Sequence, residues 1–296
     1  MSNKSSSYAL WTELLSSPQA KTLIQLSLEE DIGSGDITTE AMFPIPIPTE
    51  ALLIARSETT VCGIPLAQEL LRMADPAITT EVLVEEGQVV EAGKTILRIT
   101  GDIRPILIFE RPILNYLMRL CGIATQTKTA LQAIPKQCPT QIYDTRKTLP
   151  GWRAFDKLAV RIGGGQNHRF GLYDAYLIKD NHVAICGGIK AAVERAKAHR
   201  EKNSQSIQIE VDTLKQFQEA LEANPDMILL DNFSLTELAQ AVHLNDNRFP
   251  LEASGGITLE TIPQIAQTGV HRISIGAITH TVKPADLALD IPEGAR

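Results

Sequence analysis

The chain has 296 residues, of which 44% are hydrophobic and 21% charged, and its formal net charge is −7. This length allows one large domain or two medium ones with a sizeable core. The acidic balance argues against nucleic acid as the main partner, because proteins that bind the phosphate backbone need a broad basic surface. No apolar run approaches the roughly 18 residues of a membrane span, so we expect no membrane partner.

The cysteines and the N-terminal sequence favour a reducing compartment. The four cysteines form no CxxC pair and no short disulfide ladder, which is typical of buried free thiols. They are Cys62, Cys121, Cys138 and Cys186. Polar residues interrupt the start of the chain too often for the apolar core of a signal peptide. We therefore expect a cytoplasmic protein.

Helical spacing dominates the start of the chain. Residues 1–7 are expected to be loose, whereas apolar residues over 9–28 predict two helical pieces that break near residues 16–18. The acidic stretch 29–38 follows. Its spacing matches no EF-hand calcium loop, and we prefer a turn in which Asp36 caps the next segment.

Residues 50–101 alternate between apolar and polar positions, which predicts an antiparallel sheet with one helix packed on it. The expected strands are 51–55, 80–84 and 95–99, and the expected helix is 65–73. Gly93-Lys94-Thr95 is similar to a phosphate loop, but Gly87 stands one residue too far back for GxxxxGK. The longer run over residues 85–102, which contains this motif, looks like a biotinyl or lipoyl hairpin, but it lacks a lysine at a tight turn between two such strands. We interpret both motifs as structural.

One long amphipathic helix is predicted over residues 106–133. Proline is favoured in the first turn of a helix, so Pro112 predicts that Arg111 projects from the helix N-terminus, where anions are stabilised. The alternative is a surface arginine paired with Glu110, and the spacing is equally compatible with it.

From Thr140 onward, short apolar strands alternate with helical segments, which is typical of a parallel sheet. The expected strands are 141–144, 175–179, 207–212, 227–231, 250–254 and 272–276. The expected helices are 152–162, 188–200, 214–223, 234–244 and 258–268. This span is too short for a complete eight-stranded barrel, which takes roughly 250 residues. The prediction is an α/β fold with an open barrel of six or seven strands.

Charged residues or glycines follow each of these strands. They are Asp144–Lys147, Lys179–Asp180, Glu210–Asp212, Asp231–Asn232, Ser254–Gly256 and Gly276. The carboxyl ends of the strands of a parallel barrel meet at one mouth, so we expect these groups around one cavity. We expect the turn Ser254–Gly256 to lead into a helix, so that backbone N–H groups and the helix dipole face a phosphate.

The segment Asp144–His182 reverses the sign of the chain's charge. It contains seven lysines and arginines against four aspartates, which leaves a net charge of +3. Its cations stand in pairs beside turn residues and share the segment with aromatic side chains such as Trp152 and Tyr173. These features favour a site for a polyanionic small molecule over the alternative, a solvated basic surface.

The sequence resembles the quinolinate phosphoribosyltransferase family, also called nicotinate-nucleotide pyrophosphorylase (carboxylating). The motifs that carry the resemblance are DTRKTLPGWRAFDKLAVRIGGGQNHRFGLYDAYLIKDNH, EDIGSGDITTE, ERPILNYLMRLCGIAT, EVDTL, LLDNFS, EASGGIT and ISIGAITH. The resemblance implies an N-terminal α/β sandwich domain over residues 1–126, with 281–296 packing back on it, and an open α/β barrel over 127–280. It also implies a homodimer or larger assembly in which the neighbour completes each active site.

Position by position, the resemblance implies which residues bind the two substrates. The implied quinolinate site consists of Arg146, His168, Arg169 and Lys179, with Arg111 supplied by the other subunit. The implied phosphoribosyl pyrophosphate site consists of Lys147, Glu210, Asp231, Ser254, Gly255, Gly256, Gly276 and His280. Of these, Lys147, Glu210 and Asp231 are the implied catalytic residues, and Lys147 is shared between the substrates.

The implied reaction transfers the phosphoribosyl group to quinolinate and releases CO₂, giving nicotinate mononucleotide and pyrophosphate for NAD biosynthesis. Glu210 and Asp231 are expected to hold Mg²⁺, partly through the substrate, because this hard cation prefers oxygen ligands. Both carboxylates would also stabilise positive charge that develops on the ribose. The chain departs from the family at Cys121, where serine is expected, and at Trp152, where many members carry leucine or phenylalanine.

Three other functions remain open from the sequence. A related phosphoribosyltransferase would act on another base, a Schiff-base aldolase would use Lys179, and a non-catalytic metabolite-binding protein would have kept the pocket. Taken singly, Lys179 and Asp231 also fit a salt bridge at the barrel mouth, and His168 also fits a cap on the preceding glycine turn.

Overall fold

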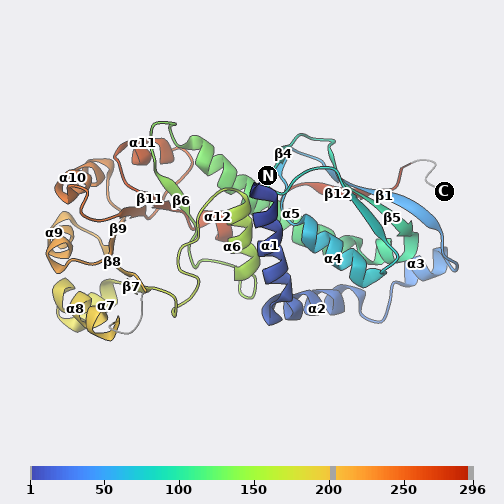
Figure 1. The fold of residues 1–296 in the computed structure, drawn as a ribbon, viewed down its shortest axis with the longest axis horizontal. Coiled ribbons are helices and arrows are strands. Elements are labelled where there is room, and N and C mark those ends of the chain that lie inside the picture. Colours follow the sequence, from blue (N-terminus) through green and yellow to red (C-terminus); the bar gives the residue numbers. More distant parts are fainter. Residues whose placement is uncertain (1, 201–204, 293–296) are drawn as a thin grey trace. The chain divides into compact units, whose positions relative to one another are not determined.

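The structure, a computed structural model, describes residues 2–200 and 205–292. The chain divides into two compact units (Figure 1). The sheet unit comprises 1–128, 148–164 and 279–296, and the barrel unit comprises 129–147 and 165–278. The predicted domain limits of 1–126 and 127–280 stay a prediction, and residues 293–296 of the C-terminal segment lie outside the described residues.

A four-stranded antiparallel sheet in the order β12-β1-β5-β3 forms the framework of the sheet unit. Its strands are β1 (Pro48–Ala55), β3 (Thr79–Val82), β5 (Thr95–Asp102) and β12 (Leu287–Asp290). The three strands predicted within 50–101 are therefore confirmed. Along β1, Ala51, Leu53 and Ala55 are buried and alternate with less buried residues, as expected for a strand with one face on a core. β12 pairs with β1 through Leu289 and Leu53.

Two smaller elements complete the sheet region. A short ladder joins β2 (Thr59–Thr60) to β4 (Val89–Val90). Helix α4 (Ile64–Ala74) matches the predicted helix 65–73 and buries a row of apolar residues on one side.

Two helices, α1 (Ser2–Ser16) and α2 (Pro18–Ile32), begin the described chain. The predicted break between them is confirmed, because the Ser17 hydroxyl caps α2 by accepting a hydrogen bond from the backbone N–H of Ala20. The expectation of a loose segment over residues 1–7 is wrong for residues 2–7, which belong to α1. Residues 2–7 are all polar, so the sequence shows no apolar spacing there that would predict a helix. Further along, the buried Trp11 anchors α1.

The predicted turn around Asp36 is also present. The Asp36 carboxylate accepts hydrogen bonds from the backbone N–H groups of Thr38 and Thr39 and so caps α3 (Ile37–Met42). These hydrogen bonds hold the pKa of Asp36 below its usual value.

Helix α5 (Ile103–Ala133) is the long helix predicted over 106–133. It begins earlier than predicted, so Pro105 stands in its first turn and Pro112 lies inside it. The expectation that Arg111 projects from the helix N-terminus is therefore wrong, because Arg111 is an exposed residue in the body of α5. Pro105 and Pro112 are both candidates for the first turn of this helix, and the apolar spacing of the sequence does not distinguish between them.

The two departures from the family pattern both have partners in the sheet unit. Trp152 stacks on Tyr116 with 4.7 Å between ring centroids, just before α6 (Arg153–Ile162). The Cys121 thiol accepts a hydrogen bond from the backbone N–H of Cys62 (3.2 Å) and donates one to its carbonyl (3.3 Å). A serine hydroxyl at position 121 would be able to make the same two bonds, so cysteine replaces serine without leaving these groups unpaired.

A six-stranded parallel sheet in the order β6-β11-β10-β9-β8-β7 forms the barrel unit. Its strands are β6 (Gln141–Tyr143), β7 (Tyr176–Ile178), β8 (Ile207–Val211), β9 (Met227–Asp231), β10 (Leu251–Ser254) and β11 (Arg272–Ser274). The first strand in the sequence pairs with the last, and the order is otherwise sequential, as in a barrel. Because β6 and β7 are both edges, the barrel is open, and the predicted fold class is confirmed.

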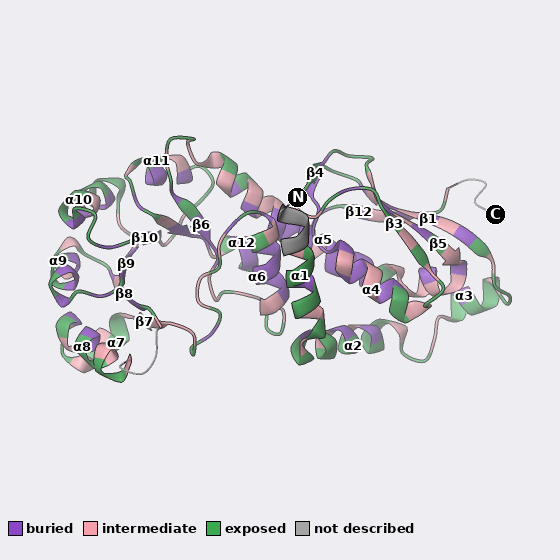
Figure 2. Cartoon of the chain, viewed as in Figure 1, coloured by how far each residue is buried: buried purple, intermediate pink, exposed green. Residues whose placement is uncertain are grey.

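Helices follow the barrel strands, and most lie where the sequence predicted them. They are α7 (Asp180–Cys186), α8 (Ile189–Arg200), α9 (Leu214–Ala223), α10 (Leu235–Asn245), α11 (Ile262–Gln267) and α12 (Ala277–His280). In Figure 2 the barrel strands are largely buried, whereas exposed residues gather on the helices. The short helices α7 and α12 were not predicted, and α11 begins later than the predicted 258–268 because residues 258–261 form a turn.

Two general expectations can be compared with the described residues. Among residues 2–200 and 205–292, no helix is long and apolar enough to cross a membrane. All four cysteines are free, two of them buried and two half-buried.

Candidate functional site

The register of the barrel strands aligns the polar residues that follow them. Ser254 pairs with Asp231 on the neighbouring strand, and Ile178 pairs with Ile209. One residue further along, the Lys179 ammonium forms a salt bridge with the Glu210 carboxylate, with 2.5 Å between Nζ and Oε2. The structure thus brings these predicted site residues together at the carboxyl edge of the sheet, which is where such barrels carry their active sites.

Two arginines join this group. Partial burial and the nearby Arg146 lower the pKa of Arg169, and Asp174 and Glu210 oppose that shift. The Nη1 group of Arg169 donates a hydrogen bond to the carbonyl of Ala175 (3.2 Å), while its buried Nε finds no hydrogen-bond partner among the described residues. Two neighbouring guanidinium groups repel each other, and an anion between them would remove that repulsion.

A buried carboxylate, expected at the barrel mouth but assigned no role with either substrate, holds the loop of Arg169. Asp144, directly after β6, accepts hydrogen bonds from Asn167 Nδ2 and from the backbone N–H of His168, both at 2.7 Å. It is fully buried. Asp144 opens the basic segment in the sequence, and its position after an apolar strand was the available signal.

The lysine and histidine predicted beside these arginines differ in exposure. Lys147 is exposed, and its backbone N–H donates to the Thr145 hydroxyl at 3.0 Å. His168 is largely buried: its Nδ1 accepts a hydrogen bond from the backbone N–H of Arg169 (2.8 Å), and its Nε2 lies 3.5 Å from Glu252 Oε1.

Carboxylates gather on the next strand ends. Burial raises the pKa of Asp212, the carboxylates of Asp231 and Asp180 raise it further, and Lys179 opposes them. Asp231 and Asp180 therefore each lie close enough to Asp212 to repel it. Asp212 and Asp180 were expected at the barrel mouth as strand-end residues, but neither was assigned a role in binding a substrate.

These carboxylates suit Mg²⁺ only as a shared site. Within the described residues, no group of three His, Cys, Asp or Glu side chains has the geometry to hold a metal by itself. Mg²⁺ usually keeps several waters and binds through one or two carboxylates plus substrate phosphates. Carboxylate oxygens that repel one another at a strand edge fit that mode.

The turn after β10 is built for glycine. Gly255 has φ +93°, and a Cβ there would lie 2.2 Å from Asn232 Oδ1 and 2.9 Å from Asn232 N. Asn232, a strand-end residue that was expected near the cavity without a substrate role, itself has φ +56° and donates its backbone N–H to the carbonyl of Ser254 (2.9 Å). Gly256 has φ +57° with open space around it. The side-chain-free turn leaves room for a ligand to approach the backbone.

The expectation that this turn leads directly into a helix is wrong. Helix α11 begins at Ile262, and Thr258–Thr261 form a turn before it. The positive end of the α11 dipole therefore does not lie at Gly256, and an anion at this turn would be bound by the backbone N–H groups of the turn itself. Gly276, the other predicted phosphate glycine, follows β11 in the barrel unit.

Two predicted site residues belong to the sheet unit. Arg111 is exposed on α5, and His280 ends α12, where its Nδ1 lies 2.8 Å from the Thr281 hydroxyl.

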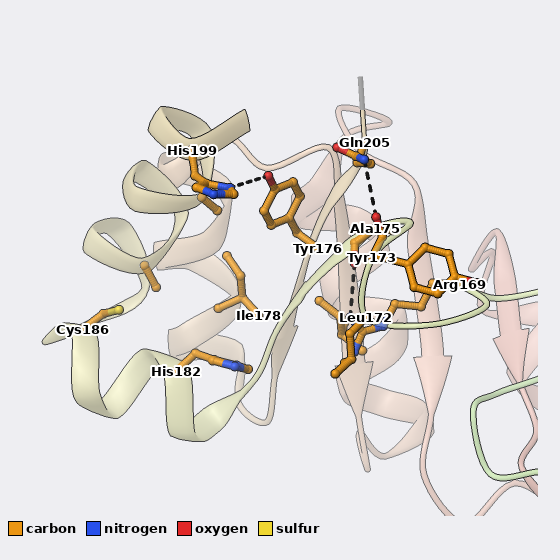
Figure 3. Close-up of a pocket in the computed structure, with 13 residues that line it drawn as sticks. Arg169, Leu172, Tyr173, Ala175, Tyr176, Ile178, His182, Cys186, His199 and Gln205 are labelled. Atoms are coloured by element: carbon orange, nitrogen blue, oxygen red, sulfur yellow. Dashed lines mark hydrogen bonds between the residues drawn. The ribbon is translucent and has the colours of Figure 1, made fainter. Parts of the chain in front are cut away.

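A hollow of about 470 Å³ lies beside the outer edge of β7 (Figure 3). Its polar groups include the Tyr176 hydroxyl, which pairs with His199 Nδ1 at 2.9 Å, and His182, whose Nδ1 accepts from the backbone N–H of Lys179. Leu172 and Ile178 contribute apolar walls. Among the described residues, Arg169 is the one predicted arginine or lysine of the site that lines this hollow, so the strand ends, where the other cations lie, suit a dicarboxylate better.

Known proteins share both the sequence and the fold. Residues 36–121 match the family model described as quinolinate phosphoribosyl transferase, N-terminal domain, and residues 123–290 match the model of its C-terminal domain. The chain is 40% identical to quinolinate phosphoribosyltransferase [decarboxylating] 2, mitochondrial, of Nicotiana glauca, over 92% of this chain and 82% of that protein. It is 38% identical to the probable nicotinate-nucleotide pyrophosphorylase [carboxylating] of Bacillus subtilis (strain 168), over 92% and 93% of the two chains.

A solved structure agrees with these matches. The nicotinate-nucleotide pyrophosphorylase from Francisella tularensis superposes with a TM-score of 0.89 at 40% identity and covers 94% of this chain and 99% of its own. Together, the matched domains, the relatives and the open barrel with its strand-end cations lead to one conclusion: the chain belongs to the quinolinate phosphoribosyl transferase family.

Proposed function

We propose that this protein transfers the phosphoribosyl group of phosphoribosyl pyrophosphate to quinolinate, with loss of CO₂, and so forms nicotinate mononucleotide and pyrophosphate for NAD biosynthesis. The names of its relatives support this reaction. Within the chain, the observation that carries the proposal is the pair of neighbouring guanidinium groups, Arg146 and Arg169, beside the Lys179–Glu210 salt bridge.

Quinolinate carries two carboxylates, which suits this group of cations. A planar guanidinium pairs with a carboxylate through two hydrogen bonds, whereas a lysine offers only a point charge. Arg146 and Arg169 would bind the carboxylates, and Lys179 would add a third positive charge held in place by Glu210. His168 supports the loop of Arg169, and Lys147 is exposed next to Arg146, where both substrates would reach it.

Phosphoribosyl pyrophosphate would lie along the adjoining strand ends. The turn Ser254–Gly256, with Gly276 after the next strand, would bind the 5′-phosphate through backbone N–H groups, and His280 would contribute a further donor. Glu210 and Asp231 would face the ribose. Their negative charge would stabilise the positive charge that develops on the ribose as pyrophosphate leaves.

The chain's own residues act mainly by position and charge. The arginines orient the ring so that its nitrogen attacks C1 of the ribose and the C1–oxygen bond to pyrophosphate breaks. The nitrogen is then cationic and stabilises the electron pair left on the adjacent ring carbon when its carboxylate leaves as CO₂, and a proton from water then takes the place of the carboxylate on that carbon. Glu210 and Asp231 would also hold Mg²⁺, which would neutralise charge on the pyrophosphate.

The assembly and location belong to the same proposal. We infer a homodimer or larger homo-oligomer in which Arg111 of one subunit completes the quinolinate site of another, because Arg111 is exposed in the body of a long helix. Four free cysteines support a cytoplasmic location, and the net charge of −7 supports a protein without a nucleic-acid partner.

The decisive assay incubates the protein with quinolinate, phosphoribosyl pyrophosphate and Mg²⁺ and measures nicotinate mononucleotide. Lys147→Ala and Glu210→Ala should each lower turnover at least about tenfold, equivalent to ~1.4 kcal/mol of transition-state stabilisation. Turnover of another pyridine or purine acid in place of quinolinate would contradict the substrate. Near-wild-type turnover in both variants would contradict the mechanism.

A further inference from the structure

A fully buried carboxylate lies inside the barrel, beneath the residues of the proposed site. Glu252, in the central strand β10, has no exposed surface. Its Oε2 accepts a hydrogen bond from Gln208 Nε2 on β8 at 2.9 Å. A carboxylate removed from water in this way costs free energy unless polar groups compensate it, so its second oxygen also requires an explanation.

The second oxygen faces a histidine of the proposed site. Glu252 Oε1 has no well-aligned hydrogen-bond partner among the described residues, and His168 Nε2 lies 3.5 Å from it. The charged neighbour in register on β11, Arg272, has its guanidinium over the Tyr143 ring at 4.6 Å. Glu252 Oε1 therefore faces the Nε2 atom of His168.

The other side of the imidazole fixes where its proton lies. His168 Nδ1 accepts a hydrogen bond from the backbone N–H of Arg169 at 2.8 Å. A nitrogen that accepts a hydrogen bond carries a lone pair, so the proton of the neutral ring is on Nε2 and points at Glu252. Both ring nitrogens are thus directed at groups of the protein itself.

We propose that Glu252 is a positioning residue: its buried carboxylate, steadied by Gln208, fixes the Nε2–H tautomer of His168 and thereby the backbone of Arg169 in the quinolinate site. This inference rests on the proposed function for the identity of the anion. It assigns His168 a role in holding Arg169 rather than in contacting the substrate through its ring nitrogens. A carboxylate that orients a histidine in this way acts as the outer partners of metal-binding histidines do.

The test uses the full chain with Glu252→Gln, which keeps the shape and removes the charge. If Gln208 keeps its hydrogen bond to the oxygen of residue 252, the new side-chain amide N–H points at the His168 Nε2–H. Two donors then face each other, so the Nε2–H tautomer of His168 is no longer favoured and the backbone of Arg169 shifts. We expect the KM for quinolinate to rise at least about tenfold. The KM for phosphoribosyl pyrophosphate should change less than twofold.

Thr140→Val is the matched control. It removes another buried polar group of the barrel, a hydroxyl that donates to the Val270 carbonyl, away from His168.

A second measurement reads the tautomer directly. In ¹⁵N-histidine-labelled protein at pH 8, with His168→Gln identifying its signal among the six histidines, wild type should show a proton on Nε2 and none on Nδ1. Glu252→Gln should lose this pattern, and Thr140→Val should keep it. If Glu252→Gln does not fold, Glu252→Asp, which retracts the carboxylate from the ring, should show the same changes in weaker form.

A wild-type His168 protonated on Nδ1 would overturn the inference, and so would a Glu252→Gln variant that keeps both the Nε2–H pattern and the wild-type KM for quinolinate. Failure of the proposed function is recognised separately. Wild type would then neither bind nor turn over quinolinate, while the tautomer would still respond to Glu252→Gln.

Discussion

Arg169 shows at the scale of a single residue how a binding site differs from a stabilising contact. Its guanidinium is partly buried beside Arg146, an arrangement that lowers its pKa and leaves its Nε without a described hydrogen-bond partner. Folding alone gains nothing from two adjacent cations. The arrangement becomes favourable when a dianion binds between them, so we assign the cost to ligand binding.

Arg169→Lys should therefore weaken quinolinate binding while keeping the charge. A lysine lacks the planar pair of donors, so we expect the KM for quinolinate to rise about tenfold or more, with less than a threefold change in the KM for phosphoribosyl pyrophosphate. Steady-state kinetics with each substrate varied in turn would measure both. Equal changes in the two constants would contradict a specific role for the guanidinium fork.

Gly255 provides a second prediction at this scale. Gly255→Ala combines a left-handed backbone with a Cβ 2.2 Å from Asn232 Oδ1, so both strain and a clash result. The matched control is Gly187→Ala, with φ +84° and open space around its Cβ, which should cost only the ~1–2 kcal/mol of the backbone conformation. Urea unfolding should show a larger loss for Gly255→Ala, together with a KM for phosphoribosyl pyrophosphate at least about tenfold higher. A Gly255→Ala protein as stable and active as Gly187→Ala would contradict the assignment of this turn.

At the scale of elements, the half-buried Glu86 carboxylate joins α1 to the start of α4 within the sheet unit. Glu86 accepts hydrogen bonds from Trp11 Nε1 (3.0 Å) and from the backbone N–H groups of Gly63 (2.9 Å) and Ile64 (2.6 Å) at the start of α4. Burial raises the pKa of Glu86 to about 7, although these three hydrogen bonds oppose the shift.

The raised pKa predicts a pH dependence of stability. The pKa of a glutamate in the unfolded chain is about 4.3, so between about pH 4.3 and 7 the folded protein binds more protons than the unfolded one. The contribution of Glu86 is therefore fully present below about pH 4.3 and is lost as pH rises to about 7, by at most ~4 kcal/mol. Urea unfolding from pH 5 to 8 should show Glu86→Gln gaining stability relative to wild type as pH rises. A flat difference, like that expected for the exposed Glu13→Gln on α1, would contradict it.

The barrel elements were predictable because two independent signals coincide in each strand. In β9, for example, Met227–Asp231 is an uninterrupted apolar run that ends in a charge, and both features follow from a buried parallel strand whose end lines a site. Helix α7 was missed because it has no buried residue and hence no apolar spacing. Pro112 misled the prediction of the α5 start because a helix interior tolerates a proline only through packing that a sequence does not reveal.

The site was predictable to a smaller extent than the fold. Arg146 was identifiable as part of the basic segment, and Lys179 as a charge that directly follows an apolar strand. Asp144 and Glu252 carry charge too, but their importance depends on burial and on partners distant in sequence. Such pairings arise only from the register of the sheet, which single-strand patterns do not encode.

At the scale of the whole molecule, the proposed lending of Arg111 between subunits makes a prediction about mixtures. Arg111→Ala and Glu210→Ala should each be nearly inactive alone, because each variant lacks one component of every site. In a dimer whose sites draw Arg111 from the partner, a hybrid of the two variants contains one site with both defects and one intact site. Random pairing makes about half of the dimers hybrids, so co-expressed variants should regain about a quarter of wild-type activity.

The experiment gives the two variants different affinity tags and isolates the hybrid by sequential purification, after which nicotinate mononucleotide formation is measured. The purified hybrid should reach about half of wild-type activity, since one of its two sites is intact. A doubly tagged mixture of Arg111→Ala with wild type serves as the control for the purification. If Arg111 instead completed the site of its own chain, each chain of the hybrid would carry one defect in its own site. The hybrid would then be no more active than its parents, and that result would contradict a shared site.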